Sequence, residues 1–438
     1  MSAVFKSACR QMLAILFLFY PAFMLAAEQM SLPQPLTLEI ALQFVDDAGH
    51  FQVQSANEDL QQALAEIDQS QSNNDFRVNL SGRLSKVGVS AAGDPAEDND
   101  SVVSLFVRKP LYDFGKTSAR DQLALMNVEL KRLEKEYLLQ QRHLSITQKF
   151  LDVLHADNEY LRHNEDLAIG YIRYDRAREN RELGLSSELE VMESQAAYEV
   201  IRQNRANSEN LQRYTRFLLA EELGFPDSPP SELSLPELET GRKIGDDINS
   251  LAEQAFKHSL LVRIQQKKVE IAQQQIEMAR HLTGPTLDAE LEVSEYAREG
   301  STRDDWRASI FFDMPLYAGS AEKSARSIAS AKHRRELADF NRVRSELRLT
   351  VLKLWQSIRQ NELRLSGNLV NQEFRDMTLD RSRAEYELEF KTDLGDSMVQ
   401  FSESRMKTFQ ARFDLEMSWR KLEALVGAAY LDTQKTSN

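Results

Sequence analysis

Few residues of this chain have the types and spacing that chemistry requires. Gly115-Lys116-Thr117 matches the end of a phosphate-binding loop, but the first glycine of that loop would fall on Pro110. Without that glycine the backbone amides cannot close around a phosphate. The seven histidines contain no pair spaced four residues apart and no His-Glu-x-x-His motif. The sequence therefore predicts neither a nucleotide site nor a zinc site.

Residues for other kinds of chemistry are missing as well. Cys9 is the single cysteine, which rules out an internal disulfide, a cysteine zinc site and an iron–sulfur cluster. The serine nucleophile motif Gly-x-Ser-x-Gly does not occur. A formal net charge of −14 offers no basic surface to nucleic acid. We expect a protein that is not an enzyme, needs no cofactor and does not bind nucleic acid.

The first 27 residues are typical of a secretory signal. Lys6 and Arg10 are the only charged side chains before Glu28, and the apolar run between Arg10 and Glu28 ends in small residues. Pro21 interrupts this run, which is shorter than the about 20 residues of a membrane-spanning helix. We expect cleavage near Ala27, with a membrane anchor as the less favoured alternative. The rest of the chain has no comparable apolar stretch, so any membrane span would be made of strands.

Two proline-free stretches, 111–225 and 316–438, predict very long helices. Both are rich in Ala, Leu, Glu, Gln and Arg, which are strong helix formers. Their apolar residues recur at spacings of three, four and seven, the pattern of helices that pack as coiled coils. A helix over 116–183 would be about 100 Å long. This length indicates a rod or a tube.

Four short segments alternate apolar and polar residues with the period of a strand. They lie at 76–84, 103–108, 287–294 and 306–314. The expected apolar stripe of the last two segments consists of Leu287, Ala289, Leu291, Val293, Ile310 and Phe312. Asp288, Glu290 and Glu292 would share the opposite face, where they would either disfavour anions in a pore or simply line a wet interior. The pattern fits a transmembrane barrel, and two soluble hairpins packed on helices are the alternative.

The chain repeats itself at an offset of 205 residues. Pro110-Leu111-Tyr112 reappears as Pro315-Leu316-Tyr317, and 182–189 aligns with 387–394. Each half is expected to contain a helix, two strands, a very long helix, a break and a further helix. We therefore divide the chain into a signal (1–27), a first repeat (28–225), a linker rich in Pro, Ser and acidic residues (226–247), a second repeat (248–428) and a tail (429–438).

This order of elements, the two Pro-Leu-Tyr motifs, the Gly184-Leu185-Ser186 break and the duplication together resemble the TolC-like outer-membrane efflux and secretion channels. The resemblance covers about 36–429. It implies a mainly α fold with a transmembrane β-barrel, in which a homotrimer closes a 12-stranded barrel from four strands per chain above a long coiled-coil α-helical barrel. Four strands alone cannot close a barrel, and lipid does not tolerate open sheet edges. The expected strand-to-helix turns are Pro110, Leu111, Tyr112 and Gly115, and then Pro315, Leu316, Tyr317 and Gly319.

The resemblance also implies a function. A TolC-like protein would be the outer-membrane exit duct of a tripartite efflux pump or a type I secretion system, with a tunnel that extends into the periplasm. It would passively conduct drugs, toxic compounds or secreted polypeptides. Its partners would be outer-membrane lipid, a periplasmic adaptor (membrane fusion) protein and an inner-membrane pump of the RND, ABC or MFS type. The competing interpretation is a periplasmic coiled-coil scaffold or adaptor protein without a membrane pore.

Two sets of site residues follow from the same resemblance. The adaptor would dock at the breaks between helices, which are Gly184, Leu185 and Ser186 and then Glu389, Phe390 and Lys391. A periplasmic gate would be closed at rest by polar links, and its residues align with Glu190, Tyr386 and Lys391. The acidic rings of similar channels would fall on Gly395 and Met398, which carry no charge. Asp393 and Asp396 flank those positions and are the candidates to replace the rings.

Overall fold

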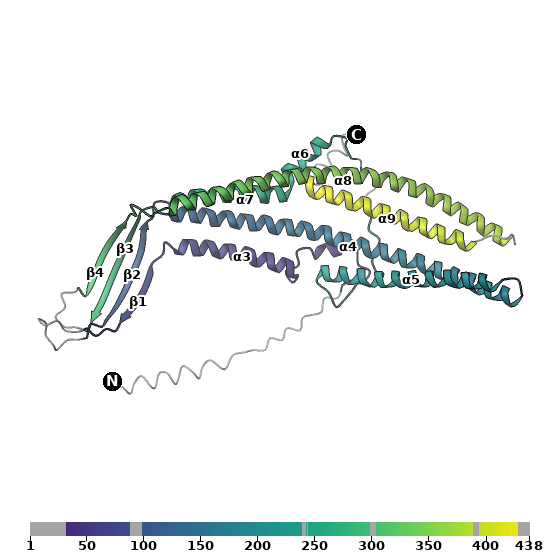
Figure 1. Cartoon of the computed structure of the whole chain (residues 1–438), viewed down its shortest axis with the longest axis horizontal. Helices are drawn as coiled ribbons and strands as arrows, with labels where there is room; N and C mark the ends of the chain where they lie inside the picture. Colours follow the sequence, from purple (N-terminus) through teal and green to yellow (C-terminus); the bar gives the residue numbers. More distant parts are fainter. Residues whose placement is uncertain are drawn as a thin grey trace, which may run out of the picture.

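The computed structural model describes residues 32–87, 99–238, 242, 244–297, 304–388 and 394–427. The expected signal, the expected tail and Cys9 lie outside these residues. So do four of the expected site residues, Glu389, Phe390, Lys391 and Asp393. Element labels follow Figure 1.

The molecule is elongated, with a β-sheet at one end and helices along the rest of its length (Figure 1). The first half of the chain contributes α2 (Leu38–Gln43), α3 (Phe51–Ser72), β1 (Arg77–Arg83), β2 (Val102–Tyr112), α4 (Lys116–Glu182) and α5 (Glu188–Leu223). The second half contributes α6 (Ile248–His258), α7 (Leu260–Arg280), β3 (Thr286–Tyr296), β4 (Trp306–Asp313), α8 (Ala321–Glu387) and α9 (Leu394–Val426). The sequence of helix, two strands, long helix and shorter helix thus occurs in both halves.

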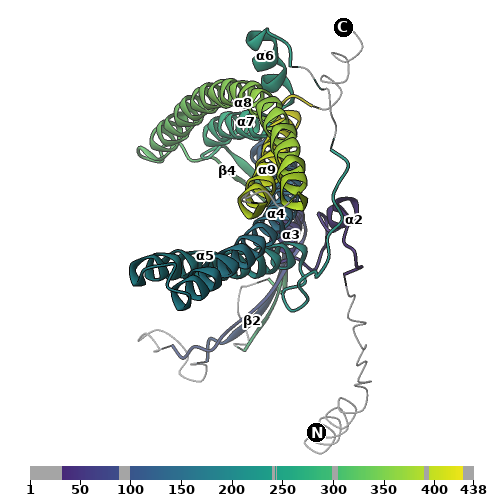
Figure 2. The same ribbon diagram turned by 90° about the vertical axis from the view of Figure 1, so that its right-hand side faces the viewer.

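The two long helices have the length that the sequence indicates. Helices α4 and α8 each contain 67 residues, which corresponds to about 100 Å at 1.5 Å per residue. Helix α4 packs against α5 and α8 against α9, while α4 also contacts α9 and joins the two hairpins. Seen along its length, this layer of helices is curved, with α2 and the teal linker between α5 and α6 on its convex side (Figure 2). None of the helices in the described ranges combines the length and apolarity needed to cross a membrane.

The four strands form one antiparallel sheet in the order β1-β2-β3-β4. Strand β2 runs further than the sequence pattern indicates, because it includes Pro110 and Tyr112. Its register against β3 shifts between these two residues. Proline has no N–H to donate to a ladder, so a register irregularity is the place where a strand tolerates it.

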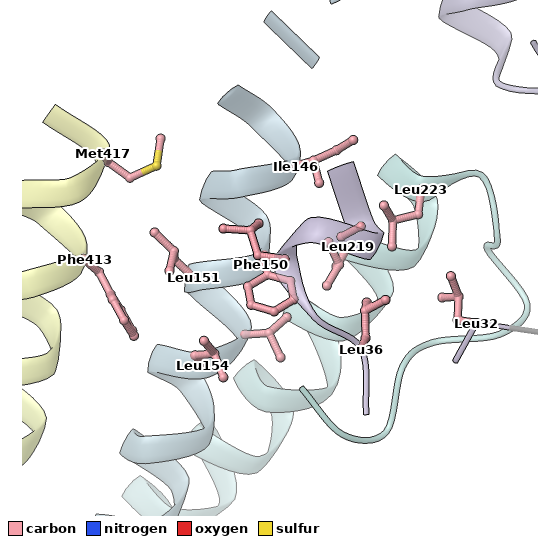
Figure 3. Packing of buried hydrophobic residues seen from close by; sticks show 13 residues of the cluster. Leu32, Leu36, Ile146, Phe150, Leu151, Leu154, Leu219, Leu223, Phe413 and Met417 are labelled. Atoms are coloured by element: carbon pink, nitrogen blue, oxygen red, sulfur yellow. The ribbon is translucent and has the colours of Figure 1, made fainter. Parts of the chain in front are cut away.

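The hydrophobic core lies midway along the helices. One cluster gathers residues from α2, α4, α5 and α9 around Phe150, which Figure 3 shows among Leu36, Ile146, Leu154 and Leu219. A second cluster joins α6, α7, α8 and α9. It includes Leu347, Val351 and Ile358 of α8, which have the apolar spacing of a coiled coil. These clusters pack the short helices α2 and α6 against the long helices. The helical layer therefore carries the sheet at one end and two hairpin tips at the other (Figure 1).

Candidate functional site

The sheet has one continuous apolar face that crosses all four strands. The backbone register aligns Leu80, Leu105, Val293 and Trp306 in one row and Val78, Val107, Leu291 and Ala308 in the next. Each member of the stripe expected from the sequence belongs to this face, since Leu287 pairs with Phe312 and Ala289 with Ile310. Leu80 and Ile310 are 73% and 70% exposed in the single chain. A contiguous exposed apolar surface indicates contact with lipid or with another protein.

The other face of the sheet is polar and carries charges of both signs. Glu290 pairs across the strands with Arg108, whose Nε lies 2.8 Å from Glu290 Oε2. Glu292 lies opposite Arg307 on β4. The Ser104 and Ser294 hydroxyls lie 2.7 Å apart and are buried. Glu290 and Glu292 thus lie opposite arginines, whereas Asp288 lies opposite Pro110 and Phe311. The face therefore combines acidic and basic side chains.

Both outer strands of this sheet have an open edge. In the part of the chain that the structure describes, β1 pairs with β2 and β4 pairs with β3. Their other edges present backbone N–H and C=O groups without a strand partner. Such edges are templates for pairing with a further chain.

The connections from strand to long helix contain the expected turn residues in different positions. Pro110, Leu111 and Tyr112 are the last residues of β2, and the chain turns at Phe114 and Gly115, which have φ values of +53° and +95°. The carboxylate of Asp113, two residues before the N-cap Gly115, accepts a hydrogen bond from the Thr117 backbone N–H at 2.6 Å and so satisfies one of the free N–H groups at the start of α4.

In the second half, Pro315, Leu316 and Tyr317 follow the end of β4, and Gly319 has a φ of +63°. Leu316 and Tyr317 are about nine-tenths exposed (91% and 89%). The two turns therefore differ in structure although their sequences repeat. Apolar side chains at the second turn lie open at the junction of sheet and helices.

The first hairpin tip is a tight turn that displays apolar side chains. Gly184 has a φ of +71°, a conformation that favours glycine. Ser187 then starts α5 with a capping box, in which Glu190 N–H donates to the Ser187 hydroxyl and the Glu190 carboxylate accepts from Ser187 N–H. Leu183, Leu185 and Leu189 are all more than two-thirds exposed. The tip is therefore a tight turn with three exposed leucines.

The gate residues expected from the resemblance are not joined to one another in the described chain. The Glu190 carboxylate accepts a hydrogen bond from Ser187 N–H in the capping box. Tyr386 is 63% exposed, and its hydroxyl makes no hydrogen bond with a described residue. Asp396 instead pairs with Arg173 of α4, and nearby the Ser402 hydroxyl of α9 donates to Glu165 of α4.

A buried polar cluster around Arg142 connects α4 with the start of α3 and the end of α5. Arg142 of α4 is 1% exposed, and its guanidinium donates to the carbonyls of Val45 at 3.0 Å and Glu222 at 3.1 Å. Its Nη1 also lies 2.6 Å from His50 Nδ1 and 3.4 Å from Glu222 Oε1. Burial, and then the charge of Arg142, lower the pKa of His50. One arginine thereby ties the start of α3 and the end of α5 to the middle of α4.

The other histidines give no sign of a metal centre. Burial lowers the pKa of His143, with a further contribution from Arg420, and burial together with Arg162 lowers that of His163. No group of three or more His, Cys, Asp or Glu within the described ranges is placed to hold a metal ion.

Arg142, His50, Glu222 and Arg173 are the structurally important residues that sequence reasoning missed. Arg142 lies in a helix that is otherwise typical of a coiled coil. From the sequence alone, a single arginine in such a helix is predicted to be exposed. Its partners lie 92 and 80 positions away in sequence. No local pattern marks such a contact.

Comparison with solved structures identifies the fold. No protein-family model matches the sequence, and no curated protein matches it. The outer membrane protein VceC of Vibrio cholerae is similar with a TM-score of 0.67 and 14% identity, over 89% of this chain and 96% of that one. The CmeC outer membrane channel of Campylobacter jejuni is similar with a TM-score of 0.70 and 12% identity, over 89% of this chain and 85% of that one.

A third structure, the open state of the MtrE outer membrane channel of Neisseria gonorrhoeae, gives a TM-score of 0.69 and 12% identity over 88% of both chains. These likenesses extend over both the sheet and the long helices, because they cover nine-tenths of the chain. The low identities mean that the shared property is the fold. The protein has the fold of the TolC-like outer-membrane channels.

Proposed function

We propose that the protein is the exit duct of a tripartite efflux pump or type I secretion system in a bacterial outer membrane. Three copies would pair their open β1 and β4 edges and close a 12-stranded barrel. The long helices would form a tunnel that extends into the periplasm. Drugs, toxic compounds or secreted polypeptides would pass through it, driven by an inner-membrane pump.

One observation carries this proposal: the sheet has an exposed apolar face and two open edges at the same time. In water, both features would favour aggregation. In a closed trimer the edges would be paired and the apolar face would meet lipid, which is the arrangement that a bilayer requires of strands. The polar face with Arg108, Glu290 and Glu292 would then line a wet interior.

The similar solved structures support the same assignment at a general level. VceC is described as an outer membrane protein, and CmeC and MtrE as outer membrane channels. A scaffold or adaptor without a pore would have no use for an apolar sheet face of this extent. We therefore rank the channel above the scaffold.

Cell fractionation tests the location and the assembly. We expect the full chain in outer-membrane fractions, as a trimer that resists detergent and falls apart on heating. A chain that stays in the periplasmic fraction as a monomer would contradict the proposal and favour the scaffold.

We further propose that a periplasmic adaptor docks at the tips, with Gly184, Leu185 and Ser186 in the contact. Cys9 is the only native cysteine and belongs to the expected signal, so a Ser186→Cys variant would carry one defined thiol. We expect this variant to cross-link to an adaptor in cells. A cysteine at Asn368, on α8 and far from the tip, is the matched control and should not cross-link. Equal capture at both positions would contradict docking at the tip.

A further inference from the structure

Two helices flank the open edges of the sheet. Helix α3 packs on α4, α4 on α7 and α7 on α8, so the helices beside the sheet follow the order α3-α4-α7-α8 (Figure 1). This order matches β1-β2-β3-β4, because α3 leads into β1 and β4 leads into α8. Next to the open strand edges, α3 and the first part of α8 therefore each have one side that faces away from the rest of the described chain.

The side of α3 that faces away from α4 carries a row of exposed residues. The buried residues of α3 are Val53, Ala63 and Ser70, and Ser70 donates a hydrogen bond to Asp121 of α4. On the opposite side, exposed residues recur at spacings of four and three, which places them on one face of the helix. This α3 row consists of Gln54, Glu58, Gln61, Ala65, Asp68 and Ser72.

The first part of α8 has a similar row on the side that faces away from α7. Its buried residues are Ala329 and Val343, and on the same side Glu336 accepts a hydrogen bond from Gln265 of α7 at 2.9 Å. Exposed residues on the opposite side again recur at spacings of three and four. This α8 row consists of Ser324, Ser327, Ala331, Arg334, Ala338 and Asn341.

Helix α3 is negatively charged. It contains four acidic residues and no basic one. Asp59 pairs with Lys131 of α4 at 3.0 Å, and Glu66 accepts a hydrogen bond from a glutamine of its own helix. Glu58 and Asp68, which belong to the α3 row, have no side-chain partner among the described residues. The exposed row therefore presents two uncompensated carboxylates.

The first part of α8 is positively charged. Residues 321–342 contain six lysines and arginines and three acids. Each of these acids pairs with an arginine of the same helix, in Glu322–Arg326, Glu336–Arg335 and Asp339–Arg342. Three cations have no ion pair with a described residue, and they are Lys323, Lys332 and Arg334. Arg334 belongs to the α8 row and Lys323 flanks it, so this row has the charge opposite to that of the α3 row.

We propose that the α3 row of one copy packs on the α8 row of the next copy and that their opposite charges pair across this contact. Both rows begin beside the sheet and extend about 25 Å along their helices. The helices run in opposite directions, because α3 enters the sheet and α8 leaves it. Glu58 and Asp68 are ten residues apart and Lys323 and Arg334 eleven, so Asp68 meets Lys323 where Glu58 meets Arg334.

This inference rests on the proposed trimer, in which pairing of β1 with β4 brings the two rows together. It adds that the copies recognise one another by charge as well as by strand pairing. Exposed ion pairs are individually weak, but two pairs at each of three contacts act together. The stability of the trimer should therefore fall when salt screens these charges.

Charge reversal with rescue tests the contact in the full-length protein. The measured quantity is the temperature at which trimers extracted from outer membranes dissociate into monomers on a gel. Glu58→Lys with Asp68→Lys, and separately Lys323→Glu with Arg334→Glu, should each lower this temperature by several degrees, because like charges then face each other. The variant with all four substitutions restores opposite charges and should recover most of the loss.

Glu39→Lys with Glu232→Lys is the matched control and should leave the temperature unchanged. Both acids are exposed, make no side-chain contact that pairs them with a described residue, and belong to α2 and the linker on the convex side (Figure 2). A stable wild-type trimer would overturn this contact, and leave the proposed duct intact, if the α3 variant behaves like the control or if the four substitutions bring no recovery. A wild-type chain that never forms a trimer would overturn the proposed function and this contact with it.

Discussion

Arg173 of α4 and Asp396 of α9 form an ion pair that joins the two helical hairpins close to their free ends. Arg173 precedes the end of α4 by nine residues, and Asp396 is the third residue of α9. Both side chains are about half exposed, so such a pair contributes at most about 1 kcal/mol. Three copies in a trimer could hold neighbouring hairpins together and still be released when a partner binds.

We propose this pair as a link that would hold the expected periplasmic gate closed. We expect Arg173→Ala and Asp396→Asn each to raise the conductance of the protein in a planar bilayer several-fold. The charge-reversed double variant, with Arg173→Asp and Asp396→Arg, should bring the conductance back toward the wild-type value. If single and double variants all behave like the wild type, the pair does not hold the tunnel closed.

Two substitutions of Glu190 distinguish a role of this residue in the gate from a role in the stability of α5. Glu190→Gln removes the charge but keeps a side chain that can complete the capping box, whereas Glu190→Ala removes both. If Glu190 acts in a gate with Tyr386 and Lys391, both variants should raise the conductance, and Tyr386→Phe should add to the effect. If its role is the cap alone, only Glu190→Ala should change the protein, by a loss of stability of about 1 kcal/mol.

The two faces of the sheet should respond differently to the same substitution. Leu291→Arg places a charge on the apolar face, where arginine costs about 2–4 kcal/mol in the middle of a membrane. Ser309→Arg is the matched control, because Ser309 lies beside Glu290 on the polar face. We expect gel electrophoresis of unheated outer membranes to show trimers for Ser309→Arg and few for Leu291→Arg. Equal trimer yields would contradict the assignment of the faces.

The stability of the helical domain should fall in mild acid. His50 faces Arg142, Glu222, Asp47 and Glu221, and its pKa in the folded protein is lowered from 6.5. The unfolded chain therefore binds a proton at a higher pH than the folded chain does. The stability from neutral His50 is complete above about pH 6.5 and is lost as the pH falls toward the lowered pKa.

The measurement is the thermal unfolding midpoint of the purified protein at pH 7.5 and pH 5.5. His50 is the N-cap residue of α3, and its ring accepts a hydrogen bond from the Gln52 backbone N–H. His50→Asn keeps a side chain suited to this position and removes the titrating group. This variant should show a smaller difference between the two midpoints. Some pH dependence should remain, because burial also lowers the pKa of His143 and His163. An unchanged difference would exclude His50 as a source.

The architecture could be predicted because it rests on local periodicity. The proline-free coiled-coil patterns predicted two very long helices, and the bounds expected for the first, 116–183, agree closely with α4 (Lys116–Glu182). Period-two patterns located four strands, and alternation placed Leu291 and Ile310 on one face. The extension of β2 through Pro110 was not predictable, because proline normally ends a strand and only the register shift accommodates it.

The contacts between distant segments could not be predicted. Arg142, His50 and Glu222 meet only when α3, α4 and α5 are packed, and no sequence period carries that information. The same holds for Arg173 and Asp396. Glu190 differs from these residues, because Ser187 and Glu190 have the spacing of a capping box, a local signature that the sequence does carry and that the assignment of Glu190 to a gate overlooked. Contacts of single polar residues depend on packing angles, which sequence patterns leave undetermined.

Single-channel recording from the purified full-length protein in a planar lipid bilayer tests the proposed duct most directly. We expect discrete conductance steps with little preference for cations or anions, because Arg108 and Arg307 accompany the acids on the polar face of the sheet. The Leu291→Arg protein, prepared in the same way, should give few or no steps. A channel function would be contradicted if the wild-type protein inserts as a trimer and never conducts, and if the Arg173→Ala variant does not conduct either.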